Sequence, residues 1–181
     1  STEQIEHLRQ LGFNRLSFGV QDFDPDVQAA VNRQQSEEQI YALVAAARAA
    51  QFKSVSVDLI YGLPLQTVAS FDVTLSKIIA LRPDRIAAYS YAHLPHIFKP
   101  QNQIDDSLLP DPDTKLALLQ AAVEKRLMGE VPLGALLSGG VDSTAVVSAM
   151  AAASTQPVKT FSIGFDDPEY DELPYAREVA R

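Results

Sequence analysis

Apolar runs typical of strands alternate with helical patterns along the first 98 residues or so. These runs predict strands over 15–20, 55–62 and 85–91, and helices over 3–11, 25–32, 38–50 and 68–80. A strand–helix–strand order predicts parallel βαβ units with right-handed crossovers. The strands show little alternation of apolar and polar residues, which favours a sheet covered on both faces.

A different pattern follows. Residues 95–113 hold four of the eleven prolines and predict irregular chain, after which Asp111 caps a helix. Its apolar positions step by 3, 4 and 4, one continuous helical face: Leu116, Leu119, Val123 and Leu127. Beyond it the sequence predicts a strand over 134–137, a glycine turn, a helix over 143–153, a strand over 158–164 and a helix from about 173. No internal repeat is visible.

Composition and charge narrow the function classes. The 181 residues carry a net charge of −8 without a cluster of Lys and Arg, so nucleic acid and anionic membranes are poor partners. There is no apolar run of membrane-spanning length, and we expect a soluble, cytoplasmic protein that binds small molecules. There are no cysteines. This excludes disulfides, a Cys nucleophile, thiolate zinc and an iron–sulfur cluster held by the chain's own thiolates.

Polar residues stand where the predicted strands end, the place where parallel α/β proteins put their chemistry. Gln21 follows the first strand, Asp58 lies in the second, and the word YAH begins at Tyr91. Taken singly, each is a common loop-capping residue. The sequence resembles oxygen-independent coproporphyrinogen III oxidases, which are radical S-adenosylmethionine enzymes of haem biosynthesis. Four segments, in this order, carry the resemblance: GFNRLSFGVQDF, VNRQQ, VDLIYGLPLQT and YAHLPHIF. The resemblance extends over residues 1–119.

This resemblance implies a partial parallel (βα)6 barrel whose strand ends hold S-adenosylmethionine. The family's cofactor-binding residues match four positions here: Gln21, Arg33, Asp58 and Ala92. It also implies a cluster-binding CxxxCxxC loop that would precede residue 1. Since the chain has no cysteine, we expect it not to generate the radical by itself.

Two further patterns in this region are similar to metal sites. Asp22, Asp24 and Asp26 mimic the start of a calcium loop, but Val27 and Arg33 stand where that loop needs Gly and Glu. His93 and His96 are separated by Leu-Pro, which prevents helical presentation, and no third ligand is evident. We therefore expect structural roles and no metal site.

The stretch ALLSGGVDST, residues 135–144, places a buried strand, a Gly-Gly turn and a helix start in succession. Gly139 and Gly140 allow a ligand to approach the backbone, and the N–H groups of a helix N-terminus attract anions. Asp142 is suited to holding Mg²⁺ against phosphates. No Lys follows the glycines, so this is not a Walker loop, and Ser138 lacks the preceding glycine of a nucleophile elbow.

This part of the chain resembles the synthetase domain of glutamine-hydrolysing asparagine synthetases. The resemblance is carried by the motif SGGVDS and by the flanking segments VEKRLMGEVPLGALL, VKTFSIGF and YDELPYAREVA. This implies an ATP pyrophosphatase loop and the first βαβ unit of an adenine-nucleotide α-hydrolase-like sheet over residues 120–181. The implied ATP/Mg²⁺ contacts are Leu137, Ser138, Gly139, Gly140, Val141, Asp142, Ser143 and Ile163. The glutaminase Cys and the aspartate pocket are absent from these residues.

The sequence therefore predicts two fused fragments, 1–119 and 120–181, joined inside one helix between about Lys115 and Val123. We favour a fusion in which neither activity is complete, with association through exposed sheet edges. One alternative is an ATP-binding protein that uses residues 138–143. Another is a non-catalytic binder of S-adenosylmethionine or a porphyrinogen through Gln21, Arg33 and Asp58.

Overall fold

The computed structural model describes residues 2–127, 134–164, 167 and 171–181. The chain divides into two compact units, Ser1–Leu118 and Leu119–Arg181. Each unit contains its own parallel sheet, which confirms the predicted mixed α/β class. Among the described residues, no helix is long and apolar enough to cross a membrane.

The first unit is built on a three-stranded parallel sheet with strand order β1-β2-β3. The strands are β1 (Arg15–Gln21), β2 (Ser54–Tyr61) and β3 (Arg85–Ser90). Gly19, Asp58 and Ala87 are register partners across the three strands. The predicted parallel βαβ order is therefore confirmed, and the carboxyl ends of all three strands meet at one edge of the sheet.

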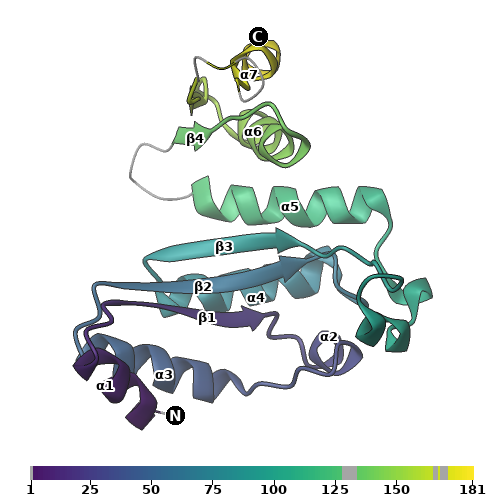
Figure 1. Ribbon diagram of the computed structural model, residues 1–181. Coiled ribbons are helices and arrows are strands. Elements are labelled where there is room, and N and C mark those ends of the chain that lie inside the picture. Colours follow the sequence, from purple (N-terminus) through teal and green to yellow (C-terminus); the bar gives the residue numbers. More distant parts are fainter. Residues whose placement is uncertain (1, 128–133, 165–166, 168–170) are drawn as a thin grey trace. The chain divides into compact units, whose positions relative to one another are not determined.

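Four helices connect and flank these strands: α1 (Thr2–Gln10), α2 (Pro25–Ala30), α3 (Glu37–Ala49) and α4 (Val68–Leu81). Figure 1 shows α3 and α4 on the same side of the sheet. Side-chain caps fix where the helices begin. Asp24 accepts the N–H groups of Asp26 and Val27, while Thr67 and Ser70 form a reciprocal capping box at α4.

The prediction that both faces of this sheet are covered is wrong. Side chains of β2 alternate in burial: Val55, Val57 and Leu59 are at most 1% exposed. The residues between them, Ser56 and Asp58 among them, are only partly buried. One face carries the apolar core under the helices, and the other carries small and polar groups, which is the period-two pattern of a sheet with one covered face.

The segment predicted as irregular contains two short 3₁₀ helices, η1 (Lys99–Gln103) and η2 (Asp106–Leu108). Helix α5 (Pro112–Leu127) follows, and the boundary between the two units falls within it. The Asp111 side chain accepts the N–H of Thr114, so the predicted cap at the start of this helix is present.

The second unit contains a two-stranded parallel sheet of β4 (Gly134–Leu136) and β5 (Lys159–Phe161). Helix α6 (Val141–Ala153) joins them, and α7 (Leu173–Val179) follows. Its buried apolar residues include Ala135, Leu137, Val147, Met150 and Ala176. The strand predicted over 158–164 is shorter in the structure, because the Ser162 hydroxyl donates to the Leu137 carbonyl directly after β5.

Candidate functional site

Three of the predicted ligand residues are brought together at the carboxyl end of β1. The Arg33 guanidinium donates to the Gly19 carbonyl over 2.9 Å, although the two residues lie 14 positions apart. A Cβ added at Gly19 would lie 2.9 Å from Gln21 Nε2 and 3.0 Å from Arg33 Nη2. Asp58 is the register partner of Gly19 on the neighbouring strand. Gly19 thus leaves the space in which the Gln21 and Arg33 side chains lie, beside Asp58.

Gln21 holds an unusual conformation at this point. Its φ of 67° lies in the left-handed region, and the β1–β2 register shifts between Gly19 and Gln21. Such a backbone position costs a non-glycine residue about 1 kcal/mol or more. The Gln21 Oε1 atom is buried and has no hydrogen-bond partner among the described residues. A buried acceptor without a donor costs free energy. A ligand that donates an N–H or O–H group to this oxygen would offset that cost.

Asp58 and Ala92 differ in the groups that they present at this edge of the sheet. One carboxylate oxygen of Asp58 accepts the Ser17 hydroxyl over 2.8 Å, on the less buried face of the sheet. Ala92 is exposed in the chain after β3, where its carbonyl accepts from the Gln101 amide over 3.0 Å. Asp58 therefore presents its side chain beside the Gly19 position, whereas Ala92 is anchored through its backbone.

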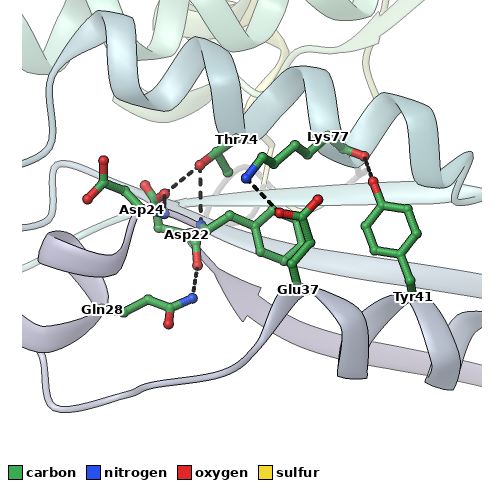
Figure 2. A network of polar contacts seen from close by, with 8 residues as sticks. Asp22, Asp24, Gln28, Glu37, Tyr41, Thr74 and Lys77 are labelled. Atoms are coloured by element: carbon green, nitrogen blue, oxygen red, sulfur yellow. Dashed lines mark hydrogen bonds and ion pairs between the residues drawn. The ribbon is translucent and has the colours of Figure 1, made fainter.

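A buried polar network beneath this edge was not foreseen from the sequence. Asp22 is 1% exposed, and its carboxylate accepts from the Thr74 hydroxyl, the Gln66 amide and the Asp24 N–H. Figure 2 shows Asp22 between Thr74 of α4 and Gln28 of α2. The Gln28 amide donates to the Asp22 carbonyl over 2.8 Å. This network fixes the loop that carries Gln21.

The residues of the two metal-like patterns make other contacts in the structure. Within the described ranges, no group of three or more His, Cys, Asp or Glu side chains is arranged to hold a metal ion. Asp22 belongs to the buried network and Asp24 caps α2. The Tyr91 hydroxyl lies 3.3 Å from His93 Nδ1, and burial raises the pKa of this tyrosine.

The chain after β4 passes through a turn at Gly139 and Gly140 into the start of α6. Gly139 has a φ of +84°, and a Cβ there would lie 2.5 Å from the Tyr175 Cβ. The hydroxyls of Ser138 and Ser143 are 3.0 Å apart, and the Gly140 N–H donates to Ser138 Oγ. Gly140 is the N-cap of α6 and has no side-chain cap, so the described residues leave the first N–H groups of the helix without a side-chain acceptor.

The remaining predicted ATP contacts are divided between buried and exposed positions. Leu137 is 2% exposed, its N–H donates to the Phe161 carbonyl, and its own carbonyl accepts from Ser162. Val141 is 86% and Ile163 69% exposed. Asp142 is exposed in the first turn of α6. Leu137 therefore supports the loop from within the core, whereas Val141, Asp142 and Ile163 are exposed.

Comparisons with known proteins match the two ends of the chain to different families. Residues 1–78 match the family model of the Radical SAM superfamily, and residues 115–181 match that of asparagine synthase. The oxygen-independent coproporphyrinogen III oxidase of Thermostichus vulcanus is 55% identical over 117 residues, covering 65% of this chain and 36% of the relative. The enzyme of Pseudomonas aeruginosa is 53% identical over 118 residues, covering 65% and 26%.

A solved structure of a coproporphyrinogen III oxidase is also similar to this chain. Coproporphyrinogen III oxidase from Escherichia coli, described as a Radical SAM enzyme, aligns with a TM-score of 0.67 and 51% identity. The alignment covers 68% of this chain and 28% of that one. The predicted resemblance of the first segment to coproporphyrinogen oxidases is therefore confirmed. The chain spans between 26% and 36% of the length of these curated relatives.

Proposed function

We propose that the chain fuses a coproporphyrinogen oxidase-like segment, residues 1–119, to the opening segment of an asparagine synthetase-like ATP domain, residues 120–181. The first segment is part of a radical S-adenosylmethionine barrel and binds this cofactor at the carboxyl edge of its sheet. These 181 residues supply no cysteine thiolate for the cluster that the radical reaction needs. The partners of the chain are small molecules.

The observation that carries this proposal is the buried, unpaired Gln21 Oε1 beside Arg33 and Asp58. S-adenosylmethionine offers an amino group and ribose hydroxyls as donors and a carboxylate as acceptor. Gln21 and Asp58 can accept from the donors, and the Arg33 guanidinium can donate to the carboxylate. The residues present therefore fit the cofactor. The likeness to coproporphyrinogen III oxidases at 55% identity supports the same assignment.

The proposed lack of turnover rests on ligand chemistry. Iron–sulfur clusters are held by Cys thiolates, and the 181 residues contain none. When bound, such a cluster supplies the electron that cleaves S-adenosylmethionine. Within this chain, the strand-end residues bind and orient the cofactor, and they do not reduce it.

Isothermal titration of the purified chain with S-adenosylmethionine tests the binding. We expect one site per chain, with an affinity that falls about tenfold or more in Arg33→Ala, because a charge-assisted hydrogen bond is lost. Incubation with S-adenosylmethionine and dithionite, followed by chromatography, tests turnover. No 5′-deoxyadenosine is expected. Absence of titration heat contradicts the binding, and formation of 5′-deoxyadenosine contradicts the lack of turnover.

A second candidate function is ATP binding by residues 138–143. It is favoured by the uncapped start of α6, which directs backbone N–H groups toward the Gly139–Gly140 turn. The match of residues 115–181 to the asparagine synthase family supports it. Titration with Mg-ATP tests it: heat that disappears in Asp142→Ala is expected, and heat that Asp142→Ala leaves unchanged contradicts the assignment.

A further inference from the structure

A lysine from α5 reaches the same edge of the first sheet. Lys115 Nζ donates to the Tyr91 carbonyl, directly after β3, over 2.6 Å. Its stem lies against Gly62, directly after β2, where an added Cβ would lie 2.7 Å from Lys115 Cε. Because Gly62 also has a φ of +85°, the turn both requires glycine and leaves room for the lysine stem. These contacts bring a cation to the carboxyl ends of β2 and β3.

The Lys115 ammonium has no anionic partner among the described residues. No Asp or Glu carboxylate of those residues forms an ion pair with it, and the Tyr91 carbonyl is the hydrogen-bond acceptor that the structure provides. An ammonium has three N–H donors, so two are left over. The side chain is partly buried, and this burial lowers the pKa of Lys115. A partly desolvated cation without a counter-ion is unfavourable in the free protein.

We propose that Lys115 binds a carboxylate of the small molecule held at the carboxyl edge of the first sheet. This assignment rests on the proposed function, and it adds a cationic contact to those of Gln21, Arg33 and Asp58. Lys115 is anchored beside Tyr91, the residue before Ala92, whereas Arg33 is anchored at Gly19 on the opposite outer strand of the sheet. The two cations approach the edge from different strands, so a ligand with a carboxylate at the β2–β3 end meets Lys115 without displacing Arg33.

Two ligands can supply such a carboxylate: S-adenosylmethionine, when its single carboxylate pairs with Lys115 in place of Arg33, and a coproporphyrinogen, through its propionates. Titrations with S-adenosylmethionine and with coproporphyrin III, the stable oxidised form of the porphyrinogen, separate them. Decarboxylated S-adenosylmethionine and coproporphyrin tetramethyl ester are the matched probes without a free carboxylate. Lys115→Met keeps the stem against Gly62 and removes the charge, and Lys115→Arg keeps the charge. Lys99→Met removes a charge from the exposed η1 segment as the control.

We expect Lys115→Met to weaken at least one carboxylate probe about tenfold or more, since a hydrogen bond to a charged group is lost. Its matched probe without the carboxylate loses no affinity, Lys115→Arg restores part of the loss, and Lys99→Met binds like the wild type. Equal weakening of charged and uncharged probes, or no weakening, overturns the assignment and shows that Lys115 only fastens α5. If the wild-type chain binds neither carboxylate probe, the proposed function fails and this assignment fails with it.

Discussion

The Gln66 side-chain amide donates a 2.5 Å hydrogen bond to the Asp22 carboxylate, joining the loop after β1 to the loop after β2. The other end of the same amide accepts the Gly62 N–H over 2.6 Å. Gln66 and Asp22 are 3% and 1% exposed. The buried Gln66 thus links the loop after Gln21 to the turn at Gly62, against which Lys115 packs. The loops that carry the candidate site are thus linked by a buried polar network.

This network predicts the effect of Thr74→Val. The Thr74 hydroxyl donates to Asp22 and accepts the Phe23 N–H, so valine leaves two buried groups short of a partner at nearly constant volume. We expect the free energy of unfolding to fall by about 1–3 kcal/mol. Urea unfolding followed by circular dichroism measures it, with exposed Thr155→Val as the control. Equal stability of the two variants contradicts the role given to the network.

Gln21→Leu separates ligand binding from stability. Leucine removes the buried oxygen that has no partner, so we expect the unliganded chain to be as stable as the wild type or more stable. Affinity for S-adenosylmethionine is expected to fall about tenfold, because the ligand loses an acceptor. Thermal unfolding and isothermal titration measure the two effects. A variant that loses stability and keeps its affinity shows that the Gln21 amide is structural.

The two glycines of the second loop are predicted to respond differently to alanine. Gly139 has a positive φ and close contact with Tyr175, so Gly139→Ala is strained and destabilises its unit. A Cβ at Gly140 would lie 3.4 Å from Ser138 Oγ at an ordinary φ of −71°, so Gly140→Ala keeps the fold. If the loop binds Mg-ATP, Gly140→Ala narrows the anion approach and lowers the titration heat. Unchanged Mg-ATP affinity in Gly140→Ala contradicts the loop assignment.

The ion pair between Lys77 of α4 and Glu37 of α3, with an N–O distance of 2.6 Å, gives a pH-dependent prediction. Its hydrogen bond to Glu37 raises the pKa of Lys77 above the ordinary value of 10.5. The resulting stabilisation is therefore complete below pH 10.5 and is lost as the pH rises through the higher folded-state value. Both side chains are about one-third exposed, which limits the contribution to about 1 kcal/mol or less.

The matching experiment compares urea unfolding of the wild type and Lys77→Met at pH 8 and at pH 11. We expect a stability difference at pH 8 that shrinks at pH 11 and in high salt. Lys53→Met, at an exposed position, is the control. A difference that is the same at both pH values means that Lys77 acts through packing on Phe23, whose ring centroid lies 5.8 Å from Nζ, and not through Glu37.

The order of strands and helices was predictable because each apolar run ends at a local signal. Asp24, Thr67 and Gly12 illustrate this: two cap helices through their side chains, and the third has a φ of +93° after α1. The alternation in β2 was also present in the sequence, since Ser54, Ser56 and Asp58 interrupt Val55, Val57 and Leu59. The prediction that both faces of the first sheet are covered did not take these polar residues into account.

The buried network could not be derived from local patterns. Asp22 lies 44 residues from Gln66 and 52 from Thr74 in the sequence, and its neighbours Asp24 and Asp26 suggest a solvated loop. One signal was available. Thr74 stands on the buried stripe of α4 between Phe71 and Ile78, where a polar side chain needs a partner. The sequence contains no indication of which residue that partner is.

The proposed binding of S-adenosylmethionine at the carboxyl edge of the first sheet can be measured at a single residue, Asp58. The measurement is an equilibrium titration of S-adenosylmethionine into the wild type, Asp58→Asn and the exposed-site control Asp106→Asn. We predict saturable binding to the wild type and the control, and an affinity about tenfold lower for Asp58→Asn, because the carboxylate that accepts from the ligand is neutralised. Absence of saturable binding to the wild type, or equal affinity of all three proteins, contradicts the claim.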